Sequence, residues 1–208
     1  NFLSDSNLPI LNIFIYDEVS CGQKNIGEAS KVWLHYALKS LSEQLNGNLI
    51  FFNDSALEVF KYLTESLNVK FISWNRCYEP WRIERDKKIK KFIENCDIKV
   101  KTFNGSLLWE PWNILKADGS PYKVYSPYFK RGCLNSQKPR YPFERKKIKN
   151  SNEKIHSLNL EELDLLPKKR WGNSIIKKWD ISETGAHEKK ISFFKNGLKN
   201  YKVGRNFP

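Results

Sequence analysis

Methionine and cysteine are scarce in this 208-residue sequence. It contains no methionine, and because position 1 is Asn, we expect the sequence to begin inside a longer gene product. The four cysteines lie far apart and form no Cys-x-x-Cys pair, which argues against a zinc site or a redox-active pair; they are Cys21, Cys77, Cys96 and Cys133. Free thiols are typical of a reducing compartment, so we expect a cytoplasmic protein that holds no metal.

Long apolar runs and the common catalytic motifs are also missing. No apolar run approaches the ~20 residues that span a bilayer, so we expect no membrane association. The sequence has no Walker loop, no Gly-x-Gly-x-x-Gly and no Gly-x-Ser-x-Gly, which disfavours NTPases, dinucleotide dehydrogenases and hydrolases. None of the histidines has Asp, Ser or Cys at a catalytic spacing, so we expect structural roles for all of them: His35, His156 and His187.

Acidic residues are outnumbered by basic ones. The 36 Lys and Arg exceed the 23 Asp and Glu, which gives a formal net charge of +13. Such an excess suggests a polyanionic partner, because Lys and Arg release counterions when they approach phosphates. A basic surface that only aids solubility, or a lysine bias from AT-rich coding, explains the charge equally well. With 40% hydrophobic and 14% aromatic residues, the chain is expected to be globular.

Short apolar segments alternate with amphipathic ones along the first half of the chain. We expect strands over residues 8–16, 49–52, 69–74 and 99–103, and helices over residues 28–45 and 55–67 and after Pro80. This alternation predicts an α/β fold with a doubly wound, Rossmann-like and mostly parallel sheet that has helices on both faces. The helix after Pro80 should turn four residues inward and its lysines outward; the inward ones are Ile89, Phe92, Ile93 and Cys96.

The composition changes after residue 134. Residues 135–154 contain two prolines and few aliphatic residues, so we expect a connector on the surface. Its basic cluster could lie along DNA, although a solvated loop is the commoner outcome; the cluster is Arg140, Arg145, Lys146, Lys147 and Lys149. Near the end, helical spacing predicts a stripe that needs a partner surface, formed by His187, Ile191, Phe194, Leu198 and Tyr201.

Two consecutive strand ends carry large aromatics beside Asn, Arg and Glu. Residues 74–81 have the sequence Trp-Asn-Arg-Cys-Tyr-Glu-Pro-Trp, and residues 105–112 have the sequence Gly-Ser-Leu-Leu-Trp-Glu-Pro-Trp. The carboxyl edge of a parallel sheet is where ligands bind. Glu79 could accept hydrogen bonds from the N–H groups of a heterocycle that stacks on a neighbouring ring. Alternatively, Glu79 pairs with Arg76 or Arg82, and the aromatics belong to the core.

These two segments, followed by Pro-Tyr-Lys-Val-Tyr-Ser-Pro-Tyr-Phe-Lys at residues 121–130, resemble the amino-terminal α/β domain of the DNA photolyase and cryptochrome family. Three such motifs in this order are a specific match, whereas one alone would be weak. Further similar segments extend the resemblance over nearly the whole chain; they include residues 29–38, Leu165-Leu166-Pro167, Trp171, residues 185–188, Tyr201 and residues 205–208.

The resemblance implies two parts of a longer protein. Residues 1–134 would form the antenna-chromophore domain, and residues 135–208 an interdomain connector that leads to a flavin-binding helical domain beyond Pro208. The family's domain begins with a strand that contains Trp-Phe-Arg-x-Asp-Leu-Arg and lies in the middle of a five-stranded sheet. No such segment occurs here. We therefore expect four strands with two open inner edges, and either a truncated amino end or a strand supplied from elsewhere.

The resemblance also implies a function for the full-length protein, namely light-driven repair of pyrimidine dimers in DNA by a deoxyribodipyrimidine photolyase. Reduced FAD in the absent domain would donate an electron to a dimer flipped out of the duplex. No catalytic residue is therefore expected here, and the fragment alone should be inactive. The implied partners are damaged DNA and the protein's own FAD-binding domain, in a monomer.

The crevice at the strand ends would hold an antenna chromophore, which in this family is a folate, a deazaflavin or a flavin. Its expected residues are Asp17, Glu28, Ser30, Asn75, Tyr78, Glu79, Trp81 and Arg82. Folate-binding members often carry Asn-Glu two and three positions beyond the matching Glu, where this sequence has Trp81 and Arg82. Two rival functions stay open, a cryptochrome-type photoreceptor and a free-standing nucleotide-binding or electron-transfer module.

Overall fold

The computed structural model describes residues 3–18, 26–144 and 146–207. Cys21 and Arg145, which the sequence interpretation used, lie outside these residues. The described chain forms two compact units. Unit 1 comprises Asn1–Ile10 and Phe60–Lys149, and unit 2 comprises Leu11–Val59 and Asn150–Pro208.

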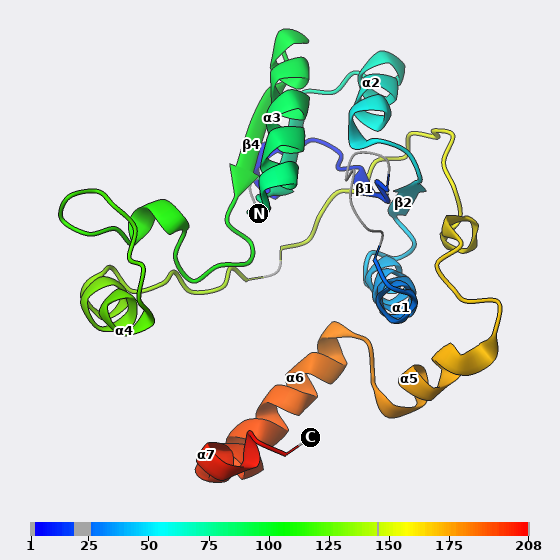
Figure 1. Cartoon of the computed structure of the whole chain (residues 1–208). Coiled ribbons are helices and arrows are strands. Elements are labelled where there is room, and N and C mark those ends of the chain that lie inside the picture. The colour runs from blue at the N-terminus through cyan, green and yellow to red at the C-terminus, as the bar shows by residue number, and fades with distance from the viewer. Residues whose placement is uncertain (1–2, 19–25, 145, 208) are drawn as a thin grey trace. The chain divides into compact units, whose positions relative to one another are not determined.

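Unit 2 is built on two parallel strands and the helix that connects them (Figure 1). β1 (Asn12–Ile15) pairs in parallel with β2 (Leu49–Phe52), and Phe14 lies opposite Phe51. The crossover is α1 (Glu28–Gln44), which ends just before Gly47. Gly47 has a φ of 76°, in the left-handed region that glycine adopts without a steric penalty, so the expected helix stop is confirmed.

The connector completes the core of unit 2. The backbone N–H of Leu158 donates to the carbonyl of Phe51 at 3.0 Å, which forms an antiparallel bridge on β2. The short helix η5 (Leu160–Leu163) follows, and its start is closed by a capping box between Asn159 and Glu162. Apolar side chains of the strands, α1 and this segment then pack together; they are Tyr16, Leu38, Leu49, Phe51, Leu160, Leu163 and Leu165. The part of the connector that follows residues 135–154, for which a surface position was expected, therefore belongs to the core.

The end of unit 2 is helical, as the sequence predicts. After α5 (Asn173–Lys178), the hydroxyl of Ser182 accepts a hydrogen bond from the N–H of Gly185 at 2.9 Å and caps α6 (Glu183–Ser192). The wider turn η7 (Phe193–Gly197), the turn η8 (Leu198–Asn200) and α7 (Tyr201–Gly204) continue it. The apolar members of the expected stripe stay 49% to 59% exposed, namely Ile191, Phe194, Leu198 and Tyr201.

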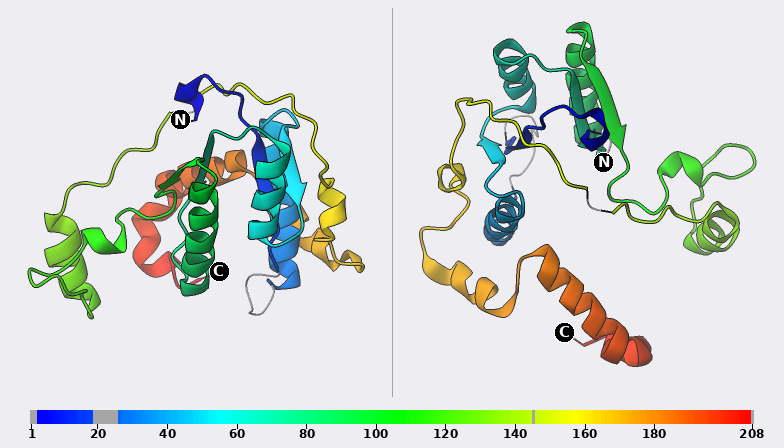
Figure 2. Two further views of the ribbon diagram at one scale, coloured as in Figure 1. Left: turned by 90° about the horizontal axis from the view of Figure 1, so that it is seen from above. Right: turned by 180° about the vertical axis from the view of Figure 1, so that it is seen from behind.

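Unit 1 contains the second pair of parallel strands. β3 (Phe71–Asn75) pairs with β4 (Lys99–Phe103), and α3 (Pro80–Asn95) crosses between them and lies along the pair (Figure 2). α2 (Ala56–Ser66) leads into this unit, and the N–H of Glu58 donates to the hydroxyl of Ser55 at 3.3 Å, one half of a capping box.

The inward face of α3 is as predicted except at its last position. Ile89 and Ile93 are 3% and 0% exposed, and Phe92 is half-buried. The prediction for Cys96 was wrong, because this residue is exposed. Cys96 caps the end of α3 with a φ of −92° and a ψ of 15°, so it no longer follows the helical spacing on which the prediction was based.

Parallel pairing of four strands confirms the α/β class. The described strands form two separate two-stranded sheets, β1–β2 and β3–β4. Within the residues that the structure describes, β1, β3 and β4 each have one edge without a strand partner, and the free edge of β2 carries only the bridge to Leu158.

His35 makes the stability of unit 2 depend on pH. Its side chain on α1 is 6% exposed, and burial lowers its pKa below the ordinary value; Lys39 acts in the same direction and Glu161 opposes it. The unfolded chain, in which His has a pKa of about 6.5, therefore binds a proton more readily than the folded chain. The contribution of His35 is fully present above about pH 6.5 and is lost as pH falls through the folded pKa.

We expect His35→Phe to flatten the dependence of the free energy of unfolding on pH between about 7 and 5, since Phe cannot take up a proton. Denaturant unfolding at a series of pH values measures this slope. The matched control is His187→Phe at an exposed position, which should leave the slope unchanged. An equal slope in wild type and His35→Phe would contradict the prediction.

Candidate functional site

Arg76 joins the carboxyl ends of β3 and β4. It follows directly after β3, and its backbone N–H donates to the carbonyl of Phe103 at 2.8 Å. Its Nη1 donates to the carbonyl and the hydroxyl of Thr102 at 2.7 and 2.9 Å, and its Nε donates to Oε1 of Glu110 at 2.7 Å. The guanidinium thereby fixes the loop after β3 against the loop after β4.

Tyr78 and Trp112 complete this cluster. The hydroxyl of Tyr78 donates to the same Oε1 of Glu110 at 2.7 Å, and its ring centroid lies 6.2 Å from that of Trp112. The guanidinium of Arg76 lies 5.8 Å from the Trp112 ring. Burial and the hydrogen bond to Glu110 raise the pKa of Tyr78, so its phenol stays protonated and remains a donor. Burial opposes the charge on Arg76, but the bonds to Glu110 and Tyr78 outweigh it and raise its pKa.

Glu79 lies at the start of α3, directly before Pro80, and faces solvent. Its Oε2 is 3.8 Å from Nε of Arg82, and the two side chains are 56% and 38% exposed. Nη1 of Arg82 lies 3.4 Å from Sγ of Cys77. Two guanidinium groups lie over the ring of Trp81; those of Arg82 and Arg85 are 5.1 and 5.4 Å from its centroid. Glu79 therefore pairs with Arg82 and not with Arg76, in agreement with the structural role that was its alternative. That Glu79 also binds a ligand stays a prediction.

Nε of Arg82 is a buried donor without a hydrogen-bond partner among the described residues. Buried polar groups nearly always have such partners, so an unpaired one calls for an explanation. Beside it, the Glu79 carboxylate is an exposed acceptor. Its Oε2 lies 3.8 Å from Nε, which is beyond hydrogen-bond distance. The exposed side of the Glu79 carboxylate can accept hydrogen bonds from the N–H groups of a heterocycle.

Asn75 and Gly105 show how closely the two strand-end loops approach. Asn75 is the last residue of β3, and it is exposed. A Cβ built on Gly105 would lie 2.4 Å from the side-chain amide of Asn75. A larger residue at position 105 would make the exposed Asn75 side chain turn away from the loop after β4.

The remaining expected site residues belong to unit 2. Oδ2 of Asp17 accepts a hydrogen bond from the N–H of Ala56 at 3.0 Å, so this carboxylate caps α2. Glu28 and Ser30 are exposed in the first turn of α1. That these three residues share a crevice with Glu79 stays a prediction.

A polar triad lies next to Asp17 at the carboxyl end of β1. The hydroxyl of Tyr16 donates to Oε1 of Glu18 at 2.6 Å, and Nζ of Lys31 lies 3.1 Å from the same oxygen. The bond from Tyr16, followed by that from Lys31, lowers the pKa of Glu18 although burial opposes this shift. Glu18 is therefore a charged acceptor beside the end of this strand.

Sequence reasoning placed Tyr78, Glu79 and Trp81 in one site after the third strand. In the structure, Tyr78 and Glu79 follow β3 and Trp81 lies in the first turn of α3. That the three residues form one ligand site stays a prediction. Sequence reasoning did not include Arg76, Glu110 and Trp112 in the site. A signal for them was present, because Arg and Glu follow consecutive parallel strands and carry opposite charges. Their contact spans 34 residues of sequence, so no local spacing reveals it.

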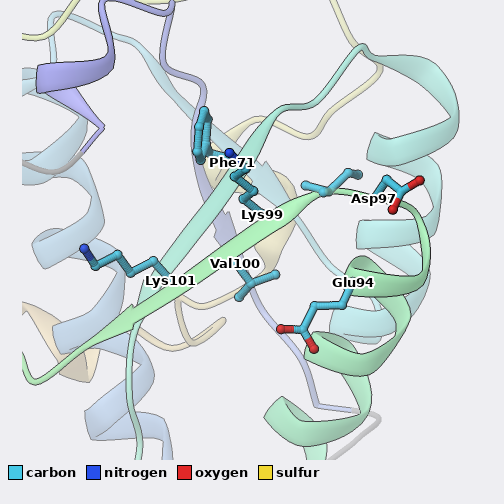
Figure 3. Close-up of a pocket in the computed structure, with 7 residues that line it drawn as sticks. Phe71, Glu94, Asp97, Lys99, Val100 and Lys101 are labelled. Atoms are coloured by element: carbon cyan, nitrogen blue, oxygen red, sulfur yellow. The ribbon is translucent and has the colours of Figure 1, made fainter.

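A pocket of about 620 Å³ lies near the amino ends of β3 and β4, away from the strand ends that carry Arg76 and Glu110 (Figure 3). Its lining comes from the end of α3 and the first residues of both strands, and includes Glu94, Asp97, Phe71, Lys99 and Lys101. Nζ of Lys99 lies 5.5 Å from the Phe71 ring. Since ligands of parallel sheets bind at carboxyl ends, this pocket is a weaker candidate than the Glu79 region.

Residues 3–18, 26–144 and 146–207 contain no group of three or more His, Cys, Asp or Glu positioned to hold a metal ion. Over the same residues, no helix combines the length and the apolar character that crossing a bilayer requires.

Comparison with known proteins gives consistent matches. Residues 4–146 match the family model described as DNA photolyase. The sequence is 31% identical over 96% of its length to a deoxyribodipyrimidine photo-lyase of Agrobacterium fabrum, of which it covers 42%. It is 27% identical over 75% of its length to cryptochrome-2 of Arabidopsis thaliana, of which it covers 27%.

A solved structure agrees with these matches. The crystal structure of a bacterial class III photolyase from Agrobacterium tumefaciens aligns with 98% of this chain with a TM-score of 0.88 and 29% sequence identity. The alignment covers 42% of that photolyase. This chain therefore spans less than half the length of the relatives that it matches.

Proposed function

Because this chain belongs to the DNA photolyase family, we propose that it forms the light-harvesting-chromophore domain and the interdomain connector of a deoxyribodipyrimidine photolyase. Residues 1–134 would form the domain and residues 135–208 the connector. The proposal is supported most directly by the site on β3 and β4, where neighbouring parallel strands end in interacting polar and aromatic side chains. The full-length protein would act on damaged DNA as a cytoplasmic monomer.

The experiment that tests this function is repair by the full-length protein. When bound in the remaining part of the protein, reduced FAD would supply the electron that splits a pyrimidine dimer. We expect loss of dimers from a UV-irradiated oligonucleotide under blue light and none in the dark. Absence of repair, with a flavin that is still reduced by light, would favour the cryptochrome alternative that the second relative suggests.

The role proposed for this chain is to hold an antenna pigment rather than to carry out repair. Transfer of excitation between two chromophores requires fixed distance and orientation, which a rigid set of side chains can provide. Glu79 would accept hydrogen bonds from the polar edge of a folate, deazaflavin or flavin, and Trp81 and Arg82 would border it. The hydrogen bonds among Arg76, Tyr78 and Glu110 would keep the loop beneath the pigment in place. An absorption spectrum of the dark-purified full-length protein would identify the pigment.

We expect Glu79→Ala in the full-length protein to weaken binding of the antenna pigment by about tenfold to a hundredfold, since a hydrogen bond to a charged group is worth about 1.5–3 kcal/mol. Repair driven directly through FAD should persist. The pigment-to-protein ratio after gel filtration measures occupancy. Glu84→Ala is the matched control, because Glu84 is an exposed carboxylate on the same helix that pairs with Lys87. Unchanged occupancy in Glu79→Ala would remove this residue from the site.

A further inference from the structure

The segment over residues 138–149 in unit 1, here called the basic–aromatic strip, has an unusual composition for a connector. Its sequence is Lys-Pro-Arg-Tyr-Pro-Phe-Glu-Arg-Lys-Lys-Ile-Lys, which contains six positively charged residues and one acidic residue. Its described residues form neither helix nor strand. No helix or strand in the described part of the strip therefore explains why charged and aromatic residues are concentrated there.

Two aromatic rings in the strip are largely exposed to solvent. Tyr141 is 88% exposed and Phe143 is 68% exposed, although burial of a large ring is normally favourable. The residue before a proline is restricted to extended conformations, and this restriction applies to Lys138 and Tyr141. Tyr141 and Phe143 are separated by one residue, so in an extended chain the distance between their Cα atoms is at most about 7 Å. The rings are thus close enough for successive bases of one strand.

The strip is held to the rest of unit 1 at both ends. Nη2 of Arg140 donates to the carbonyl of Asn104 at 2.8 Å, and its guanidinium lies 4.7 Å from the Phe143 ring. At the other end, Nζ of Lys146 pairs with Asp5 at 2.6 Å, and the carbonyl of Lys149 accepts a hydrogen bond from the N–H of Ile10 at 2.7 Å. Anchoring of this kind lowers the entropy that the strip would lose on binding a ligand.

Other cations of the strip remain available to a partner. Lys138, Lys147 and Lys149 are exposed, and no carboxylate of the described residues lies within ion-pair distance of them. Glu144 is the one acidic residue of the strip, and it has an interaction of its own. The local charge is therefore strongly positive, like that of the whole chain.

We propose that the basic–aromatic strip binds single-stranded nucleic acid. Bases would stack on Tyr141 and Phe143, and phosphates would lie beside Lys138, Lys147 and Lys149. Duplex DNA is the poorer fit, because its base faces are already stacked and closed to the rings. The proposal deepens the proposed function, in that it adds a contact for unpaired nucleic acid on the connector.

The rings are tested first, with a fluorescein-labelled oligothymidine that carries no damage and the full-length protein in the dark. The double variant Tyr141→Ala, Phe143→Ala should bind at least about tenfold more weakly, since stacking on each ring contributes severalfold or more. The ring-conserving control Tyr141→Phe, Phe143→Tyr should bind as wild type does. Equal binding by all three proteins would overturn the proposal. So would a lowered melting temperature of the alanine variant with unchanged binding, which would show that the rings pack against protein.

The lysines are tested by the dependence of binding on salt. For single strands, each phosphate contact contributes about 0.7 to the slope of log K against log salt concentration, so Lys147→Gln, Lys149→Gln should lower the slope by about 1.4. The matched control, Lys88→Gln, Lys91→Gln, removes the same charge from exposed positions of α3 and should leave the slope unchanged. Equal slopes for both double variants would overturn the proposal.

These results are distinguishable from a failure of the proposed function. Light-driven repair by the wild type tests that function, whereas the strip variants are judged only on undamaged single strands in the dark. Wild-type repair together with unaffected binding by the strip variants would overturn the strip and leave the photolyase function standing. Absence of repair by the wild type, together with the expected binding losses of the strip variants, would overturn the photolyase function and leave the proposal for the strip standing.

Discussion

Replacing Glu110 with Ala is expected to destabilise unit 1 by about 2–3 kcal/mol, since one carboxylate oxygen accepts hydrogen bonds from both Arg76 and Tyr78. The Glu110 side chain is 12% exposed and that of Arg76 is 30% exposed, so water replaces the lost acceptor only in part. The substitution would leave a guanidinium and a phenol without their common acceptor between two strand ends. Denaturant unfolding measures the loss.

A matched control separates this effect from the loss of an ordinary ion pair. Glu84 pairs with Lys87 at 2.8 Å, but both side chains are more than 60% exposed, at 63% and 67%. Exposed pairs contribute little to stability because water screens them, so Glu84→Ala should change the free energy of unfolding little. Equal losses for the two variants would show that Glu110 does not hold the strand ends together. Glu110→Gln keeps an acceptor for Tyr78 and should fall between wild type and Glu110→Ala.

The largest loss of stability is expected for Ile93→Ala, at about 3–4 kcal/mol. Ile93 is 0% exposed on the inward face of α3, so truncation removes buried methyl groups and leaves a cavity. Ile83 lies on the same helix but is 37% exposed, and Ile83→Ala should cost less than about 1 kcal/mol. Thermal and denaturant unfolding of both variants compare the same chemical change at a buried and an exposed site. A similar loss at both positions would contradict the assigned packing of α3.

Strand positions were largely predictable from apolar and β-branched residues: β2 is a continuous apolar run, whereas β4 alternates lysines with Val100 and Thr102. The predicted bounds of β2 and β4 agree with the structure. β1 is shorter than predicted, since Asn12–Ile15 replaces the expected residues 8–16. Pro9 has no N–H to donate, and the N–H of Ile10 bonds to the carbonyl of Lys149 instead of a strand. The apolar run alone could not show where the backbone hydrogen bonds go.

The candidate site was predictable in part. The sequence motif located Tyr78, Glu79 and Trp81 at a strand end, because the order of strand, polar loop and proline-started helix is local. The role of Glu110 depends on a contact between two loops, and local patterns do not contain it. Cys96 illustrates the same limit, since a helical spacing assigns a face only as far as the helix extends.

The bridge between Phe51 and Leu158 has a consequence for how the protein forms as it leaves the ribosome. β1, α1 and β2 are complete early in synthesis, but Leu160, Leu163 and Leu165, which fill the same core, emerge much later. Until then, apolar side chains around Phe51 lack their cover, and long loops must close before the core gains its last contacts. The amino-terminal half of unit 2 therefore keeps an exposed apolar surface until a segment far downstream has been synthesised. During that time, chaperones can bind this surface and the half can misassemble.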